Sequence, residues 1–477
     1  MALSWYPEGF DPLDLRQAVE KALELGASYA EARLHIKFGE GLSLLNDNVI
    51  GGGPRFSGGV AVRVIVDGSL GFASTSSWDK GSVLDAVERA VKSARSLARL
   101  SGKVTMSEER LGRASYEVKV RVKPWDTSFE DKVNFLLEVS KSLEPGKASL
   151  DSKLIAYRDD TEYKYLVTSD GGEVESLVPR VEVFYNMAAS YEGSRANKWG
   201  EVGGSGGFEL LDELGLKGRL EEDLQSLEVA LTRGEKPPKG VMDVVISPEI
   251  VGLALHESIG HPSEADRVLG REAAQAGRSY REYIGGRIGS EVVTVIDDPT
   301  VPGSSGFYLY DDEAVPARPR ILIDKGLLAE LLHNRETAAV MGVRSNAAAR
   351  ASSFRGEPIV RMATTYMAPG DYTFDELVEG IQEGVYLKNY MEWNIDEWRL
   401  TARYVGLEAY LIKGGKVERP VRNVVLQIPT QDFYSRIDAV AKDLRFYPGL
   451  CGKGEPMQPL PVWMGGPHVR LRGVRVG

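Results

Sequence analysis

The chain has 477 residues, of which 43% are hydrophobic and 27% are charged, and its formal net charge is −11. This composition is typical of a soluble globular protein with more than one domain, and it excludes a disordered or fibrous protein. The negative charge argues against a nucleic-acid partner, because phosphate binding requires a basic surface, and no apolar run reaches the roughly 18 residues that a membrane helix needs.

The N-terminus, MALSWYPEGFDPLDLRQ, lacks the basic and then continuously apolar pattern of a secretory signal. A helix is predicted over residues 11–25, since apolar positions recur there at helical spacing and a glycine follows as a stop. The rest of the first half alternates between strand and helix patterns. Its predicted elements are strands within 29–72, a helix over 82–100, a strand over 116–123, a helix near 129–143 and long strands on either side of a turn at 169–172.

A domain boundary is predicted near residues 231–240, LTRGEKPPKG, where charge, glycine and proline replace any periodic pattern. The predicted fold class is α+β, with an N-terminal α/β module at residues 1–230 and a β-rich second domain at residues 240–477. The glycine-rich run 203–207 lacks the lysine and threonine of a phosphate-binding loop, so a linker or a β-turn is expected there.

The second half leads from a buried-type strand, VMDVVISP, into LALHESIGHPSEAD, which holds two of the chain's five histidines. Residues 248–260 are apolar on almost every side, which predicts a buried helix. His256 and His261 are five positions apart, so in a regular helix their side chains would diverge by roughly 140°. Gly260 permits a departure from helical geometry, and Pro262 disfavours that geometry at His261. We therefore expect the helix to end or bulge at Gly260, which would bring the two histidines together.

A histidine, an adjacent glutamate and a nearby second histidine form a recognised zinc-binding pattern, although a buried helix end with two hydrogen-bonded histidines would contain the same residues. Catalytic zinc sites usually have three protein ligands. Glu264 and Asp266 are local candidates for a third ligand, and Cys451, the single cysteine, is a distant candidate in the turn-like sequence LCGKGEP. The residues alone leave Cys451 open between a zinc ligand and a small buried core residue. One cysteine in so long a chain also fits a reducing, cytoplasmic environment.

The stretch HESIGHPSEAD resembles the extended His-Glu-x-x-x-His motif of TldD-type metalloproteases in the TldD/PmbA family. Three further blocks extend the resemblance over most of the chain, and these are GVAVRVIVDGSLGFAST, DDEAVPARPRILIDKGLL and CGKGEPMQ. One departure is Ser258, where the family usually has alanine. This change leaves the ligand positions intact.

The resemblance implies a zinc site with His256, His261 and Cys451 as ligands and Glu257 as the general base. It favours Cys451 over Glu264 as the third ligand, so Glu264 and Asp266 are expected to support the site without binding the metal. It implies that residues 240–477 form a metalloprotease domain that hydrolyses unfolded or short peptides. In the family the zinc-bearing protein pairs with a paralogue that lacks the histidine motif. A homodimer, or a heterodimer with a PmbA/TldE-like paralogue, is therefore expected.

Two other functions are compatible with some of these residues. A peptide-binding or scaffold protein with a structural zinc site would need a fourth protein ligand, and it would have no need of Glu257 beside the metal. A zinc deaminase is disfavoured, because the paired-cysteine signature is missing. The sequence identifies no residue that stabilises an oxyanion, and His333 and His468 are expected to be structural or on the surface. Residues 311–313, DDE, could form either an acid cluster that supports the site or an exposed acidic turn, and the turn is favoured.

The first half offers long alternating strands and little chemistry, so we expect it to contribute oligomerisation and enclosure of the site. Glycine-rich strands of the second half, such as YVGLEAYLIKGG at residues 404–415, are expected to pair with the backbone of an extended peptide. Enclosure would restrict the site to unfolded chains and short peptides.

Overall fold

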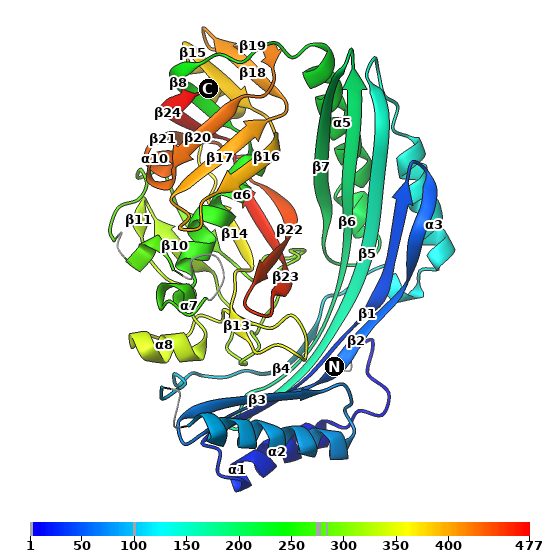
Figure 1. Cartoon of the computed structure of the whole chain (residues 1–477), viewed down its shortest axis with the longest axis vertical. Coiled ribbons are helices and arrows are strands. Elements are labelled where there is room, and N and C mark those ends of the chain that lie inside the picture. Colours follow the sequence, from blue (N-terminus) through cyan, green and yellow to red (C-terminus); the bar gives the residue numbers. More distant parts are fainter. Residues whose placement is uncertain (1–2, 99–101, 273–277, 283–284) are drawn as a thin grey trace.

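The structure is a computed structural model, and it describes residues 3–98, 102–272, 278–282 and 285–477. A long curved sheet from the first half of the chain faces a second body built from the second half (Figure 1). The elements of the first half are α1 (Pro12–Glu24), β1 (Tyr29–Leu45), β2 (Asn48–Val66), β3 (Ser69–Thr75), α2 (Lys80–Leu97), β4 (Arg113–Glu117), α3 (Phe129–Lys141), β5 (Ser149–Thr168), β6 (Glu173–Tyr191), β7 (Ser194–Ser205), α4 (Leu210–Glu213) and α5 (Leu216–Thr232). Within the described residues, no helix is long and apolar enough to cross a membrane.

The first-half sheet has seven strands in the order β3-β2-β1-β5-β6-β4, and β7 pairs with β6. Strands β5 and β6 contain 20 and 19 residues and pair antiparallel along almost their whole length. Strands of this length span about 60 Å. The sheet therefore reaches from α1 and α2 at one end to α5 at the other (Figure 1). Helix α2 lies directly on β3, where a side chain at Gly71 would overlap the carbonyl of Ala90.

The second half contains three sheets in the described residues. A nine-stranded sheet has the order β16-β17-β20-β24-β8-β15-β18-β19 with β21 on β24, a six-stranded sheet has the order β11-β10-β9-β14-β23-β22, and β12 pairs with β13. The elements are β8 (Gly240–Ile246), α6 (Pro248–Leu255), α7 (Ala265–Val268), β9 (Val295–Asp297), β10 (Arg320–Asp324), β11 (Leu327–Leu328), α8 (Arg335–Met341), β12 (Ala349–Arg350), β13 (Ile359–Val360), β14 (Thr364–Met367), α9 (Phe374–Glu379), β15 (Glu383–Leu387), β16 (Tyr390–Ile395), β17 (Thr401–Gly406), β18 (Ala409–Lys413), β19 (Lys416–Val421), β20 (Val425–Pro429), α10 (Thr430–Ser435), β21 (Ile437–Val440), β22 (Arg445–Lys453), β23 (Gln458–Gly466) and β24 (Val469–Val476).

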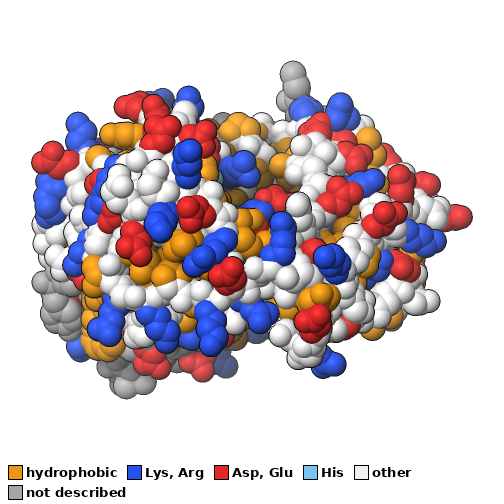
Figure 2. All heavy atoms as spheres, turned by 90° about the horizontal axis from the view of Figure 1, so that it is seen from above, with side chains coloured by type: hydrophobic (Ala, Val, Ile, Leu, Met, Phe, Trp, Pro, Cys, Tyr) orange, Lys and Arg blue, Asp and Glu red, His pale blue; other side chains and the backbone are white. Residues whose placement is uncertain are grey.

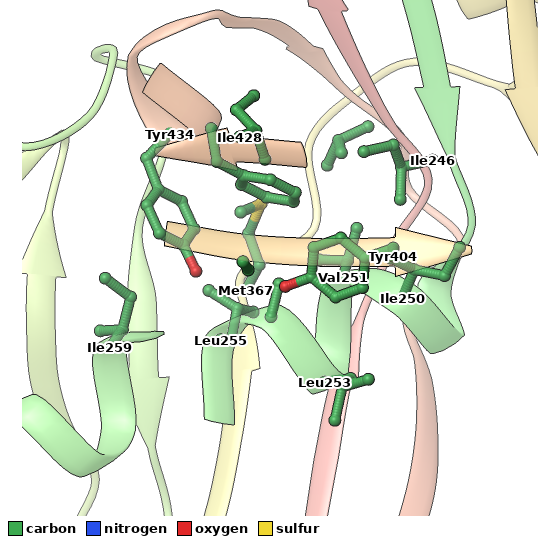
Figure 3. Packing of buried hydrophobic residues seen from close by; sticks show 14 of the residues in the cluster. Ile246, Ile250, Val251, Leu253, Leu255, Ile259, Met367, Tyr404, Ile428 and Tyr434 are labelled. Atoms are coloured by element: carbon green, nitrogen blue, oxygen red, sulfur yellow. The ribbon is translucent and has the colours of Figure 1, made fainter. Parts of the chain in front are cut away.

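Helix α6 lies in the core of the second half. Ile250, Val251 and Leu255 are fully buried on it, within a cluster that also includes Tyr404 and Tyr434 (Figure 3). A helix that is apolar on almost every side needs such a position, because no face of it is suited to water. The burial holds the chain that follows α6 in a fixed place.

The predicted mixture of helices and strands is confirmed, and several predicted bounds are corrected. Helix α2 is Lys80–Leu97, and residues 99–100 of the predicted helix lie outside the described residues. The strand predicted over 116–123 is wrong beyond Glu117, because β4 pairs with β6 only over Arg113–Glu117. The residues that follow leave the sheet and reach a short 3₁₀ turn at Pro124–Asp126.

Two features near the centre of the chain also differ from expectation. Residues 203–205 complete β7 and form neither a linker nor a turn. Glycine is required at Gly203 because a side chain there would overlap the carbonyl of Val181 on β6. Helix α5 was not predicted, and it ends at Thr232, inside the stretch assigned as a boundary. The division into residues 1–230 and 240–477 stays a prediction.

Residues 311–313 are buried, so the predicted exposed acidic turn is wrong. Glu313 accepts a hydrogen bond of 2.7 Å from Arg63 on β2, and Asp312 accepts one of 3.1 Å from Lys164 on β5. Burial, together with the nearby Glu313 carboxylate, raises the pKa of Asp311 well above its ordinary value. These carboxylates dock the second half on the first-half sheet. The cationic partners of these carboxylates are more than 100 positions away in sequence, so no local sequence pattern indicates that the carboxylates are buried.

Candidate metal centre

The two histidines of the motif lie on a widened turn that continues α6. Helix α6 ends at Leu255, and His256–Gly260 form a π-helical turn in which the backbone N–H of His261 donates to the carbonyl of His256. A π-helix bonds residue i to residue i+5, so side chains five positions apart leave the same side. The imidazole rings of His256 and His261 have their centroids 5.0 Å apart. The five-residue spacing is therefore matched by the local backbone geometry.

The expected approach of the histidines is found, but its cause differs from the prediction. The helix widens from His256 onward and does not first bulge at Gly260. Gly260 and His261 both keep right-handed helical dihedral angles, so Pro262 does not push His261 out of that region. Pro262 instead is the second residue of the 3₁₀ turn His261–Ser263, where a missing N–H costs nothing. Glycine is needed at position 260 because a side chain would overlap Met362.

Cys451 lies close to the two histidines, although it is 190 positions from His261 in sequence. It lies on strand β22, paired with Leu460 of β23, so Cys451 itself is in a strand and the predicted turn follows it at residues 454–457. The side chain is buried, and its Sγ is 3.4 Å from Nε2 of His261. One ligand atom from each of His256, His261 and Cys451 lies within 4.8 Å of the others. The structure thus brings together the three residues that the resemblance implied as ligands.

Glu264 and Asp266 lie beside this cluster, where Glu264 contacts His261 and Asp266 contacts Lys453. An oxygen of the Glu264 carboxylate lies 3.0 Å from Nδ1 of His261, so a proton on Nδ1 is held by the carboxylate and Nε2 is left facing Cys451. Burial raises the pKa of Glu264, but Lys453 and His261 outweigh burial and hold it well below its ordinary value. Asp266 accepts a hydrogen bond of 2.6 Å from the Lys453 ammonium. Neither carboxylate belongs to the converging group of ligand atoms.

Glu257 lines the same cavity as the three converging residues, and its side chain is 12% exposed. Nη1 of Arg399 donates a hydrogen bond to Oε2 of Glu257. Arg399 lies between β16 and β17 and has a φ of +62°, an uncommon value for a residue other than glycine. Residues held in such conformations cluster at functional sites. No local sequence pattern indicates Arg399, since only the return of a hairpin 142 positions later places it beside Glu257.

The three converging residues face a cavity of about 600 Å³ that lies between the two halves of the chain. The first half contributes Trp199 and Glu201 from β7 and Arg219 from α5. Facing them are residues of the second half, which include Trp393 of β16 and Tyr447 of β22. Seen from above, the surface is hollowed between the two bodies (Figure 2). A bound molecule would therefore be covered on two sides.

Comparison with known proteins places this geometry in a family. Profiles of the PmbA/TldA metallopeptidases match residues 30–98 as domain 1, residues 122–225 as the central domain and residues 239–477 as the C-terminal domain. The chain belongs to the PmbA/TldA metallopeptidase family. A metalloprotease of Methanocaldococcus jannaschii is 31% identical over 95% of this chain and 98% of its own length. The zinc metalloprotease TldD homolog of Saccharolobus solfataricus is 28% identical over 96% of this chain and 98% of its own.

Solved structures of similar proteins have the same fold as this PmbA/TldA family member. TldE from Thermococcus kodakarensis matches with a TM-score of 0.76 and 16% identity, over 97% of this chain and 100% of that chain. A protein of Bacteroides thetaiotaomicron described as a putative modulator of DNA gyrase matches with a TM-score of 0.75 and 18% identity, over 98% of each chain. At these identities the likeness concerns the fold alone. The family resemblance expected from the motifs is confirmed by the profiles and the curated relatives.

The donor set of this metallopeptidase-family chain fits a zinc ion. Two imidazoles and a thiol are the mixture of nitrogen and sulfur ligands that zinc prefers. Burial raises the pKa of the Cys451 thiol, but the two neighbouring histidines and Arg361 outweigh burial and hold it well below its ordinary value. The thiolate that results is the form that binds a metal. Among the described residues, His256 Nδ1 is buried and has no hydrogen-bond partner.

The two other histidines that the sequence analysis considered lie outside the cavity of this family member. Nδ1 of His333 is 3.2 Å from the hydroxyl of Thr337, and Nδ1 of His468 is 2.6 Å from a carboxylate oxygen of Asp443. Neither histidine lines the cavity of the metal centre. Both are buried and paired, as structural histidines are expected to be.

Proposed function

We propose that the chain is a zinc-dependent peptidase that hydrolyses short or unfolded peptides. In this proposal His256, His261 and Cys451 are the metal ligands and Glu257 is the general base. The observation that carries the proposal is the position of Glu257: its carboxylate is next to a ligand in sequence and lines the cavity into which the ligand atoms open. Membership of a metallopeptidase family and the name of the Saccharolobus solfataricus relative support the choice of zinc.

Each side chain of the site has its own role in the proposed hydrolysis. Zinc held by the three ligands would supply Lewis-acid stabilisation of the negative charge that develops on a scissile carbonyl. Glu257 would accept a proton from the attacking water and pass it to the leaving amine. Arg399 binds one oxygen of the Glu257 carboxylate, which fixes the direction of the other. Glu264 fixes His261 in the same manner.

An extended peptide fits the backbone that borders the cavity. Among the described strands, β22 stands at the end of its sheet and pairs with β23 alone, so an extended peptide could add along its outer edge beyond Cys451, whose carbonyl already accepts a hydrogen bond from Arg361. The strands within 404–415, which we expected to serve this purpose, are paired on both sides: β17 lies between β16 and β20, and β18 lies between β15 and β19. That part of the prediction is wrong. Backbone pairing gives affinity with little sequence preference.

The proposal includes a second subunit and a cytoplasmic location. The partner would be a second copy of the chain or a PmbA/TldE-like paralogue, and the fold shared with TldE from Thermococcus kodakarensis supports a related partner. A metal-binding thiolate and a single cysteine fit a reducing compartment.

A scaffold protein with a structural zinc site is the alternative. Such a site would be closed by a fourth protein ligand. In the described residues the converging group contains three ligand residues, and Glu264, the nearest carboxylate behind them, is engaged by His261 and Lys453. The geometry therefore favours an open position, as a hydrolytic site requires.

The test compares three substrates with and without zinc. The purified protein, together with any subunit that copurifies, should cleave a short peptide and an unfolded protein and leave the same protein intact when folded. Chelation should abolish cleavage, and added zinc should restore it. Equal cleavage of folded and unfolded protein would contradict enclosure, and cleavage that survives complete zinc removal would contradict the mechanism.

A further inference from the structure

A second cavity lies directly beyond the metal cavity. Its volume is about 350 Å³, and it is enclosed by the first-half sheet on one side and the β22–β23 hairpin on the other. Leu450 borders both cavities and directly precedes Cys451. A peptide that lies along β22 at the metal centre would therefore extend past Leu450 into this second cavity, which we call the basic chamber after the side chains of its wall.

The sign of the charge reverses between the two cavities. Cations outnumber carboxylates in the basic chamber, whose charged wall consists of Lys37, Arg55, Arg158 and Arg180 with Asp160 and Glu182. Carboxylates outnumber cations in the metal cavity, whose charged residues other than the histidines and the cysteine are Glu201, Glu249, Glu257, Asp396 and Glu397 with Arg219 and Arg399. A peptide carries the same asymmetry, since one end is an amine and the other a carboxylate.

The cations of the basic chamber come from neighbouring strands in register. Arg55 on β2 pairs with Gly39 on β1, two residues from Lys37, and Asp160 on β5 pairs with Arg180 on β6. Residues two apart on a strand share a face of the sheet. The charged row therefore lies across one face, turned toward the β22–β23 hairpin.

Two of these cations retain capacity for a further anion. Arg55 is 45% exposed, and its ion pair with Asp160 is long, at 3.5 Å. Lys37 is 21% exposed, and its ion pair with Glu162 is also long, at 3.4 Å, while burial lowers its pKa. Arg180 is by contrast fully engaged, since it donates to Glu162 and to the carbonyls of Ser305 and Phe307. An added carboxylate would therefore be held by Arg55 and Lys37.

We propose that the basic chamber is a receptor for a carboxylate of the bound peptide, which Arg55 and Lys37 hold beyond the metal centre. This inference rests on the proposed function for the identity of its ligand, a peptide. The carboxylate is either the C-terminal group or an acidic side chain. Because the metal cavity favours the amine end, the reversal of charge directs the carboxyl end of the peptide into the basic chamber.

The test measures binding, so that it does not depend on hydrolysis. Zinc-loaded protein with Glu257→Gln, purified with any subunit that accompanies it, is titrated with four fluorescent peptides of one length. The first has a free C-terminus and no acidic residue, the second is its C-terminal amide, and the third and fourth are amides that carry an internal Glu or Gln. Tighter binding of the first than the second identifies the C-terminal group. Tighter binding of the third than the fourth identifies a side chain.

Arg55→Gln is expected to remove the preference, with about a fivefold loss of affinity for the carboxylate-bearing peptide and no change for its neutral counterpart. Arg55→Lys should retain most of the preference, and Lys37→Gln should reduce it. The control is Arg419→Gln, which alters an arginine that is 60% exposed on β19. Equal binding of all four peptides, no binding of any, or an equal loss for all four in Arg55→Gln would overturn the proposal. A preserved preference in a protein that never hydrolyses peptides would refute only the proposed function.

Discussion

The two walls of the metal cavity are built in different ways. In the second-half wall, the two proposed histidine ligands and the proposed general base lie on one π-helical turn and its continuation, and Cys451 is added by a neighbouring strand. The first-half wall presents Trp199 and Glu201 from a long strand and Arg219 from a helix, all placed by sheet register and helix packing. Chemistry is thus concentrated on one wall, whereas the other encloses and orients. Substitutions should separate these roles.

The largest effect is expected from loss of a ligand on the second-half wall. Cys451→Ala should lose most of its zinc and, with it, all measurable peptide hydrolysis, because two histidines alone hold zinc weakly. Metal analysis of the purified variant beside the wild type measures the occupancy. Glu264→Ala is the matched control: it removes a carboxylate behind His261 and should weaken zinc binding by about 10- to 100-fold without removing a ligand. Full occupancy in Cys451→Ala together with loss in Glu264→Ala would show that the ligand assignment is wrong.

Glu257→Gln should leave zinc in place and lower the rate of hydrolysis by about 10²- to 10⁴-fold. The amide keeps the size of the side chain and can still contact Arg399, but it cannot accept the proton. Turnover number and zinc content are measured on the same preparation. Glu397→Gln changes an exposed carboxylate of the same cavity and should remain close to wild type. Near-normal turnover in Glu257→Gln would remove Glu257 from the mechanism.

The contrast between the walls also explains what could be predicted from the sequence. His256, Glu257 and His261 form a local pattern, and the approach of the two histidines was correctly expected from it. Cys451 was identified as a ligand only by resemblance, because its environment depends on β22 lying beside α6. The turn expected around Cys451 lies a few residues further on, at 454–457, because Cys451 and Gly452 are paired residues of the β22–β23 hairpin.

Residues placed by long-range pairing escaped the sequence analysis. Arg399 contacts a residue 142 positions earlier, and the Arg63–Glu313 pair spans 250 positions. Neither contact can be predicted from residue spacing, since separation in sequence does not indicate which loop packs against which strand. The expected exposed acidic turn at residues 311–313 was wrong because Arg63 and Lys164 form ion pairs with these carboxylates in the interior. A run of charged residues indicates exposure only where no such buried partner is present.

Arg399→Ala should lower the turnover number by roughly 10- to 100-fold with little change in KM, because a misplaced general base impairs the chemical step more than peptide binding. Arg399→Lys should recover part of the loss, since an ammonium can still pair with Glu257. Arg403→Ala is the control on the same hairpin, where the side chain is 38% exposed and pairs with Glu392. A faster Arg399→Ala enzyme would indicate that Arg399 restrains Glu257 and does not position it.

The smallest expected effect is on the first-half wall, at Glu201. Burial and the neighbouring Glu182 raise the pKa of Glu201 to about 7, against an ordinary value of 4.5, while Arg158 acts in the opposite direction. The folded protein therefore binds this proton more tightly than the unfolded chain does. Between the two pKa values the folded state holds more protons, so the free energy of unfolding falls as pH rises from about 4.5 to about 7.

Glu201→Gln removes this titration and should flatten the pH dependence of stability. The expected result is a gain in Tm on the order of 2 °C at pH 8 relative to wild type and no gain at pH 4.5, measured by thermal unfolding in buffers of equal ionic strength. Glu418→Gln, at an exposed position on β19, should leave the pH dependence unchanged. Hydrolysis should persist in Glu201→Gln, because the group faces the cavity from the wall that carries no ligand. An equal Tm difference at both pH values would mean that Glu201 titrates at its ordinary pKa in the folded protein. The first-half wall would then not disfavour the ionised form of this carboxylate.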